Sequence, residues 1–408
     1  MNRLDHYRLY LYGGLRVYYS YTTVQELSTV RLYSLGGHIY DKISGTAHFL
    51  EHMLFEGTKS FSKSFIQNDL VFLGCNDLNA CTSHNYIAVY GSCFTNKLAK
   101  FLKLIYELIN EPLLPAARIE KERQVILTEY LEHLNDIYSN LYFNSIEQIY
   151  PELEIDGNIL GTVDTINKIN IEDLIEYHTE NCIIPNQVLV VRTCLSGYEL
   201  NQLIAQVFPM VRSKPMTYHS MFPSFNVNVF QNNMIRIDTT DIHKGVGLLY
   251  SVPLKSSMRL PLQLLENILV SEQSDSLTDI LRNQLGIIYG ISSSINLYGM
   301  NSFFSLVTTF KHSNDIETVI EVIRNQFLQK VTEQQLDKVK MSMLIDTYVT
   351  INSCSGMIDS VLETSIFEDN VNFNKLYDKM KSVTVKIINS MLHLLANGNV
   401  YVLRNSNG

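Results

Sequence analysis

The order of predicted elements repeats in the two halves of the chain, and this repetition most restricts the fold. Alternating apolar and polar residues predict strands, and apolar residues spaced three and four apart predict amphipathic helices. The predicted strands are 8–20 (two strands with a turn at Gly13-Gly14), 27–35, 86–93 and 187–193, then 232–238, 245–251 and those that start at 288 and 302. Helices are predicted after 44, over 62–72, 98–109, 115–150 and 171–177, from 261 and after 314. The pattern indicates two copies of one α+β unit.

The region between the two halves has the composition of a linker. Residues 209–225 contain Pro209, Pro215 and Pro223, three of the nine prolines in the chain. Proline-rich polar segments are typical of boundaries between domains, and 408 residues exceed one ordinary core. We therefore predict an N-terminal domain over 1–208, a linker over 209–225 and a C-terminal domain over 226–408.

Composition and charge exclude some classes of function. The net charge of −9 argues against a nucleic-acid partner, which would require a basic surface. No run approaches 18 uninterrupted apolar residues, so no membrane insertion is expected. The first residues have no apolar segment of a signal peptide, and the six cysteines show no Cys-x-x-Cys spacing. These features predict free thiols and a cytoplasmic protein.

A short motif near residue 50 has the spacing of a metal site. Ser44 or Thr46 can cap the helix that follows. His48 and His52 are four residues apart and therefore share a helix face, with Glu51 beside them. Two imidazoles can hold Zn²⁺, and the carboxylate can take a proton from a metal-bound water. A structural histidine pair on an apolar helix would give the same spacing, so a third ligand decides between the two interpretations.

Candidate third ligands lie on the long helix predicted from Pro115 to about residue 150. Glu122 and Glu129 are seven residues apart and so share one face, which also carries His133. Taken alone, such a pair of glutamates is typical of a solvated stripe. His133 is an alternative ligand on the same face.

Several motifs together resemble the insulinase/pitrilysin family of zinc peptidases, and specifically its short, processing-peptidase-like subfamily. Residues 45–58, GTAHFLEHMLFEGT, resemble the family's inverted His-x-x-Glu-His signature. The family's third zinc ligand is a glutamate separated from the second histidine by 76 residues, which is the place of Glu129, and its accessory glutamate matches Glu122. Residues 79–82 resemble the edge that pairs with substrate, and 281–289 the Arg-x-x-x-Gly-x-x-Tyr signature of the second half.

The resemblance implies a fold and a set of site residues. The expected fold is α+β, with two similar domains, each a mostly antiparallel sheet with helices packed on one face. One Zn²⁺ per chain is expected, with Glu51 as general base. Other roles follow by resemblance alone: the metal ligands are His48, His52 and Glu129, Glu122 supports them, Asn79 and Ala80 bind the substrate backbone, and Arg282 and Tyr289 bind substrate near the scissile bond.

Residues 270–276 depart from the family, because they lack the usual glycine-rich run before the arginine. Tyr86 stands where a threonine is usual, which places a bulkier side chain next to a bound peptide.

The implied activity is that of a zinc metalloendopeptidase that cleaves unfolded or extended peptides in a closed chamber, in leader-peptide processing or peptide maturation. One chain supplies one half of such a chamber, so the resemblance implies a dimer. Because this chain carries both the zinc motif and the Arg282/Tyr289 pair, a homodimer is favoured over a heterodimer with a related chain. The alternative is a non-catalytic or partner-dependent subunit of a heterodimeric processing peptidase.

Overall fold

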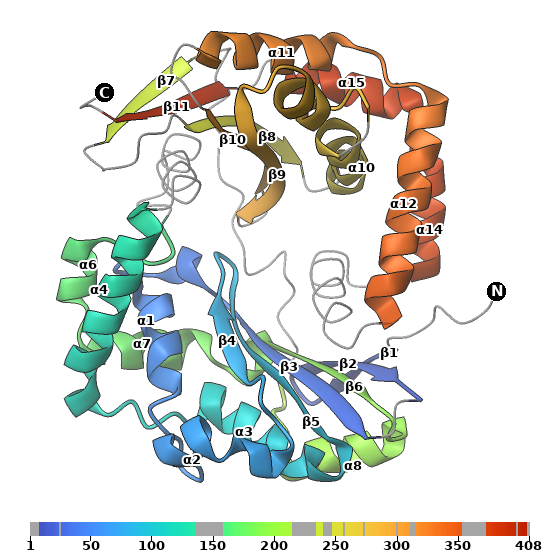
Figure 1. Cartoon of the computed structure of the whole chain (residues 1–408). Helices are drawn as coiled ribbons and strands as arrows, with labels where there is room; N and C mark the ends of the chain where they lie inside the picture. Colours follow the sequence, from blue (N-terminus) through green and yellow to red (C-terminus); the bar gives the residue numbers. More distant parts are fainter. Residues whose placement is uncertain are drawn as a thin grey trace. The chain divides into compact units, whose positions relative to one another are not determined.

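A computed structural model describes most of the chain, which forms two compact units, each built on one β-sheet (Figure 1). The described residues are 8–23, 26–135, 158–213, 234–239, 247–255, 258–271, 274–298, 301–310, 315–352, 373–396 and 399–405. The predicted α+β class with one sheet in each half is confirmed. The predicted domain bounds stay a prediction, and within the linker only residues 209–213 lie among the described residues.

The first unit contains a six-stranded sheet. Its strands are β1 (Arg8–Tyr12), β2 (Leu15–Tyr21), β3 (Leu27–Leu35), β4 (Asn79–Thr82), β5 (Tyr86–Phe94) and β6 (Gln187–Thr193), in the order β1-β2-β6-β3-β5-β4. Neighbouring strands are antiparallel except β2 and β6, which run parallel. The tight turn predicted at Gly13 joins β1 to β2, and Gly13 adopts a φ of 57° there.

The short strand β4 lies outside the strands predicted from the sequence pattern, in a polar segment over 74–82. Asn79–Thr82 pairs antiparallel with residues 87–90 of β5 and forms an edge of the sheet. Its four residues are too few to show an alternating apolar pattern, and hydrogen bonding to β5, not local sequence, makes them a strand.

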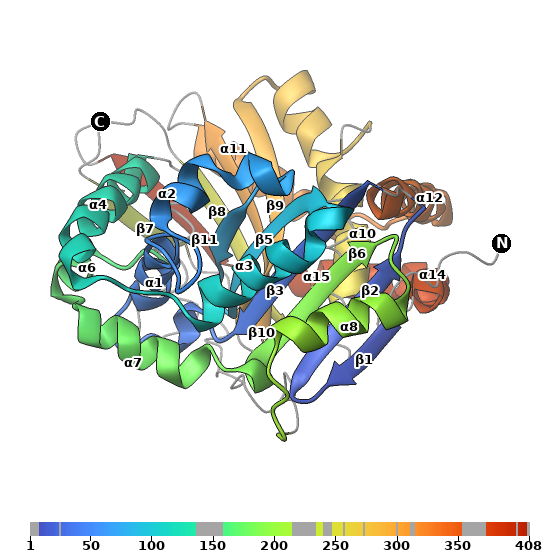
Figure 2. The same cartoon turned by 90° about the horizontal axis from the view of Figure 1, so that it is seen from below.

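Helices cover one face of the first sheet. α3 (Leu98–Asn110) and α8 (Gly197–Val207) lie across it (Figure 2). α3 buries an apolar stripe that includes Phe101, as its 3.6-residue periodicity predicts. A Cβ built on Gly91 of β5 would lie 3.1 Å from the Phe101 ring, so the backbone of the sheet and the helix approach closely. Further α-helices of this unit are α1 (Thr46–Leu54), α2 (Lys63–Asn68), the first part of α4 (Ile119–Asn135), α6 (Val163–Lys168) and α7 (Ile171–Asn181).

The second unit repeats the architecture with five strands. They are β7 (Met234–Thr239), β8 (Gly247–Lys255), β9 (Ile288–Tyr298), β10 (Asn301–Phe310) and β11 (Asn399–Asn405), in the order β7-β11-β8-β10-β9. The one parallel pair among them is β7 with β11. The helices are α10 (Arg259–Val270), η7 (Asp279–Gln284), α11 (Ile316–Leu328), α12 (Glu333–Asn352), α14 (Phe373–Ser382) and α15 (Val385–Leu395). Fully buried side chains of α10, α11, α15 and β10 form its core.

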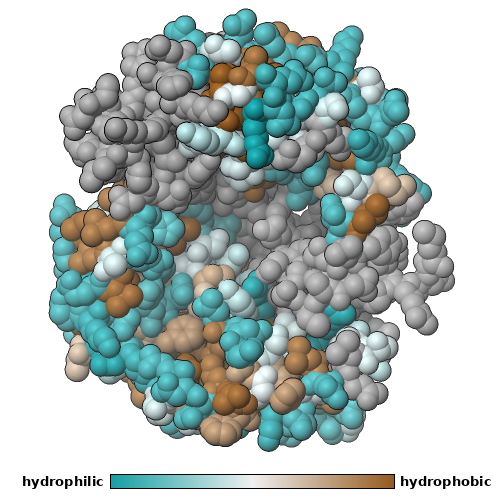
Figure 3. Space-filling view, in the orientation of Figure 1, coloured by the Kyte–Doolittle hydropathy of each residue, from teal (hydrophilic) through white to brown (hydrophobic). Residues whose placement is uncertain are grey.

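The surface carries mixed hydropathy. Figure 3 shows mostly hydrophilic residues on the visible described face, interrupted by smaller apolar patches. Within the described part of the chain, every helix is too short or too polar to span a bilayer.

Candidate metal centre

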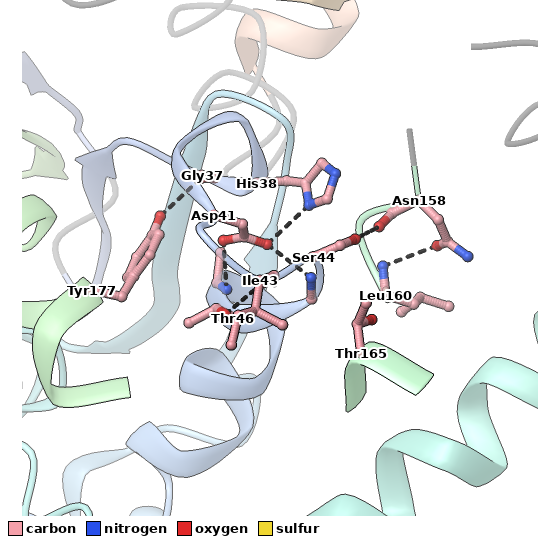
Figure 4. Close-up of polar contacts among 12 residues, drawn as sticks. Gly37, His38, Asp41, Ile43, Ser44, Thr46, Asn158, Leu160, Thr165 and Tyr177 are labelled. Carbon is pink, nitrogen blue, oxygen red and sulfur yellow. Dashed lines mark hydrogen bonds and ion pairs between the residues drawn. The ribbon is translucent and has the colours of Figure 1, made fainter. Parts of the chain in front are cut away.

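The N-terminus of α1 is held by the buried side chain of Asp41. Its two carboxylate oxygens accept the backbone N–H groups of Gly45 and Ala47, each at 2.9 Å (Figure 4). His38 Nδ1 lies 3.0 Å from the same carboxylate. Because the first N–H groups of a helix have no partner within it, Asp41 satisfies donors that would otherwise be buried without an acceptor.

The predicted helix cap at Ser44 or Thr46 is therefore wrong. The residue that precedes α1 is Gly45, which has no side chain to accept a hydrogen bond. The hydroxyls of Ser44 and Thr46 donate to the carbonyls of Asn158 and Ile43 instead. Gly45 has a φ of 92°, and a Cβ there would lie 2.7 Å from a backbone oxygen of Leu160. Close packing against residues 158–162 thus requires glycine at this point.

The loop that carries Asp41 is also fixed from outside. The Tyr177 hydroxyl of α7 donates to the Gly37 carbonyl at 2.9 Å. Burial is the largest influence on Asp41 and raises the pKa of its carboxyl, although the His38 ring and the two N–H groups act in the opposite direction. The start of α1 is thus a buried, hydrogen-bonded turn.

Asp41→Asn is expected to lower the free energy of unfolding by about 1–3 kcal/mol, because an amide offers one acceptor where two N–H donors need one each. Thermal or urea unfolding measures the loss. Glu199→Gln is a matched control, since Glu199 occupies an exposed capping box at the start of α8. A loss for Asp41→Asn no larger than that of the control would contradict the assigned role.

Three potential ligands converge beside α1. His48 is buried, His52 is half-buried, and their ring centroids lie 4.7 Å apart on one face of the helix. Glu129 reaches them from α4 (Ile119–Asn135), and one ligand atom of each residue lies within 4.8 Å of the others. Ligands that share a tetrahedral zinc ion lie roughly 3.4 Å apart, so small side-chain rotations would close this set around the ion. Two imidazoles and a carboxylate fit Zn²⁺ chemically.

The two other candidates of the predicted helix lie next to this group. Glu122 Oε2 is 3.8 Å from His52 Nδ1, and His133 Nε2 is 3.8 Å from Glu129 Oε1. His133 is not among the three converging residues. α4 begins at Ile119 and is described to Asn135, so the remainder of the predicted helix, 136–150, lies outside the described residues.

Glu51 is oriented by the edge of the sheet. The Thr82 hydroxyl at the end of β4 donates to Glu51 Oε2 at 2.8 Å. This hydrogen bond fixes the carboxylate next to the end of β4, an edge strand on which Asn79 and Ala80 also lie. The sequence motif predicts Glu51 but not its partner Thr82, because contacts between distant segments leave no local pattern.

A group of charged side chains that reaches His52 through Glu122 was also not predicted from the sequence. Glu56 forms ion pairs with Lys63 of α2 and with Arg118, whose Nε lies 2.6 Å from Glu56 Oε2. Lys63 Nζ also lies 3.8 Å from Glu122 Oε1. Burial and the adjacent Glu56 carboxyl raise the pKa of Glu122. Burial acts to raise the pKa of Glu56 too, but hydrogen bonds from Arg118 and Lys63 outweigh it and lower that pKa. These contacts connect α1, α2 and the start of α4.

The two site residues predicted in the second half lie in the second unit. Arg282 is on η7 and Tyr289 is near the start of β9, and both side chains are exposed. The structure thus brings His48, Glu51, His52, Glu122 and Glu129 together, whereas the action of Arg282 and Tyr289 on substrate stays a prediction.

Comparison with known families identifies this arrangement. Residues 16–153 match the family described as insulinase (peptidase family M16), and residues 168–343 match the peptidase M16 inactive domain. The chain belongs to peptidase family M16. The matches cover most of both halves of this M16 chain, in agreement with the resemblance found in its motifs.

Among curated relatives, the beta subunit of the mitochondrial-processing peptidase of Bos taurus is 33% identical over 195 residues, which cover 47% of this chain and 39% of the relative. The corresponding subunit of Saccharomyces cerevisiae is 29% identical over 172 residues, covering 41% of this chain and 37% of the relative. The matched stretch thus spans about two fifths of the length of these relatives.

Solved structures share the fold over almost the whole chain. A protease from Helicobacter pylori superposes with a TM-score of 0.85 at 18% identity, over 98% of this chain and 100% of that one. The periplasmic protease PqqL from Escherichia coli superposes with a TM-score of 0.74 at 16% identity, over 99% of this chain and 48% of that one. At these identities the likeness shows the fold alone.

Proposed function

We propose that this M16 chain is a zinc-dependent metalloendopeptidase that cleaves unfolded or extended peptides. The convergence of His48, His52 and Glu129, with one ligand atom of each within 4.8 Å of the others, is the observation that carries the proposal. The position of Glu51 on the same helix, one residue before His52, supplies the proton acceptor that hydrolysis needs.

Each residue of the candidate site has a definite task in this mechanism. His48, His52 and Glu129 would hold the zinc ion, which when bound polarises the peptide carbonyl and makes water more acidic. Glu51, oriented by Thr82, accepts a proton from the attacking water and returns it to the leaving amine. The Glu122 carboxylate lies 3.8 Å from His52 Nδ1. Its charge would favour a proton on that nitrogen and so leave the other ring nitrogen to the metal.

The substrate is proposed to bind as an added strand. β4 is an edge of its sheet, so the backbone of an extended peptide can pair with Asn79 and Ala80 next to Glu51. Arg282 and Tyr289 are donors that could hold a substrate carbonyl. We further propose a cytoplasmic protein that works as a homodimer or with a related chain, in leader-peptide processing or peptide maturation.

A non-catalytic or partner-dependent subunit is the second candidate function. The match of residues 168–343 to an inactive domain favours it, as do curated relatives that are named as subunits. The complete set of ligands and the general base in this chain favour the catalytic function.

Removal of zinc tests the proposal directly. The purified chain is incubated with a mixture of unstructured peptides, with and without a zinc chelator, and the products are identified by mass spectrometry. We expect cleavage that the chelator abolishes and that one equivalent of Zn²⁺ restores. A chain that holds one zinc but cleaves nothing would support the partner-dependent subunit. A chain that binds no zinc would refute the peptidase and support the non-catalytic subunit.

A further inference from the structure

The face of the first sheet opposite α3 carries a set of basic and aromatic side chains near the β4 edge. Direct pairing across β3, β5 and β4 aligns Arg31 with Tyr90 and Asn79 in one row. The next row contains Tyr33, Ala88 and Cys81. Successive residues of a strand point to opposite faces of the sheet. Gly91 lies on the face that packs against α3, so these six residues lie on the other face. The same pairing adds Arg16 of β2 and Arg192 of β6 to this face.

The Arg31 side chain is directed from β3 towards the edge strand. Its guanidinium carbon lies 4.0 Å from the centre of the Tyr90 ring on β5, and its Nη1 donates to the Tyr33 hydroxyl at 3.1 Å. Stacking and a hydrogen bond thus hold the half-buried cation in one place. A fixed guanidinium is a good partner for a carboxylate, because little conformational entropy is lost when the pair forms.

The same groups lie within electrostatic range of the general base. Burial raises the pKa of the Cys81 thiol to about 11, the charge of Arg31 acts to lower it and the charge of Glu51 to raise it. Burial likewise raises the pKa of Tyr90, with further contributions from Cys81, Arg31 and Glu51. Arg31 stacks on Tyr90, which pairs with Asn79 of β4, and Glu51 is bonded to Thr82 of the same strand. A peptide along β4 would therefore pass both groups.

We propose that Arg31, together with Tyr90 and Asn79, forms a subsite that binds the carboxylate of an aspartate or glutamate side chain of the peptide. The subsite rests on the proposed function, because it places the peptide along β4 as a substrate. The guanidinium lies over Tyr90 of β5. A peptide paired with β4 would be two strands away from β5, a distance of about 10 Å. An extended glutamate and a charge-assisted hydrogen bond, direct or through one water, cover that distance.

The position of the acidic residue relative to the cleaved bond follows from the strand. Thr82 holds Glu51, and Asn79 lies three residues earlier on β4, about 10 Å along the strand. The acidic side chain is therefore about three residues from the scissile bond, in the part of the peptide that pairs with β4 near Asn79.

The test is binding of labelled ten-residue peptides to a Glu51→Gln chain, in which cleavage does not consume the ligand. One glutamate is moved stepwise through an otherwise neutral peptide, and each peptide has a glutamine counterpart. At one position we expect the glutamate peptide to bind about five to ten times more tightly by fluorescence anisotropy. Added Arg31→Gln should abolish the preference, whereas Arg31→Lys, which keeps the charge, should retain part of it.

Arg212→Gln is the matched control, because it removes the same charge from an exposed position after α8 and should leave the preference unchanged. Circular dichroism confirms that each variant folds. Equal binding of every glutamate and glutamine pair, or a preference that survives Arg31→Gln, would refute the subsite. Chelator-sensitive cleavage of neutral peptides by the unsubstituted chain would then leave the proposed function intact. Conversely, absence of zinc binding refutes the function while the anisotropy series still decides whether Arg31 selects acidic peptides.

Discussion

Glu51→Gln is expected to lower kcat/KM for peptide cleavage by roughly a thousandfold or more, while the chain keeps its zinc. General acid–base catalysis contributes about 10²–10⁴ in rate, and an amide cannot accept the proton of the attacking water. The substitution is nearly isosteric, and the carbonyl oxygen of glutamine can still accept the Thr82 hydroxyl that now bonds Glu51 Oε2 at 2.8 Å. Steady-state kinetics on a quenched fluorescent peptide, together with metal analysis of the same preparation, measures both quantities.

The matched control is Glu132→Gln, which removes a carboxylate from an exposed position of α4. This variant should cleave at the rate of the unsubstituted chain. Full turnover by Glu51→Gln would refute the role of Glu51 as general base. Loss of both zinc and turnover would instead indicate that the substitution disturbed α1, and the kinetics would then say nothing about proton transfer.

The features that could be predicted from the sequence are those with a local period. Helical spacing places His48 and His52 on one face of α1, and the alternation in residues 86–93 predicts β5. Resemblance over a longer distance added Glu129, which lies with both histidines in the structure. The repeated order of elements likewise predicted one sheet in each half.

The features that were missed depend on contacts between segments far apart in the chain. The side chain of Asp41 acts four residues before Gly45, through a turn whose shape depends on α7 and on residues 158–162. β4 is too short to show a strand pattern and exists because β5 pairs with it. The order of strands, with one parallel pair in each sheet, is a property of chain topology and leaves no trace in local periodicity.

The charges around Glu56 illustrate the same limit. Lys63 and Arg118 are ordinary surface residues in sequence, yet both pair with Glu56 and so tie α2 and the start of α4 to the end of α1. α1 and α4 also carry the three converging residues His48, His52 and Glu129. The sequence predicts which residues are candidate metal ligands, and the contacts between elements determine whether they can meet.

Glu129→Gln is expected to reduce zinc affinity more than any other single change on α4. An amide is a poor ligand for Zn²⁺, so the ion would retain the two histidines alone, and we expect a loss of more than about a hundredfold. Glu122→Gln removes a partner of His52 and not a ligand, and the loss should be roughly 10–100-fold. Competition with a chromophoric chelator gives both affinities.

Two further measurements separate the two roles of these glutamates. Substitution with Co²⁺ reports the ligand set, so Glu129→Gln should change the visible absorption spectrum strongly, whereas Glu122→Gln should leave the same ligands and a similar spectrum. Glu120→Gln, a change at an exposed position of the same helix, should alter neither affinity nor spectrum. Zinc affinity in Glu129→Gln equal to that of this control would refute the ligand assignment. Only a true ligand should change the visible absorption of the bound Co²⁺. An identical loss of zinc affinity in Glu122→Gln and Glu129→Gln, with identical Co²⁺ spectra, would therefore mean that the two carboxylates share one role.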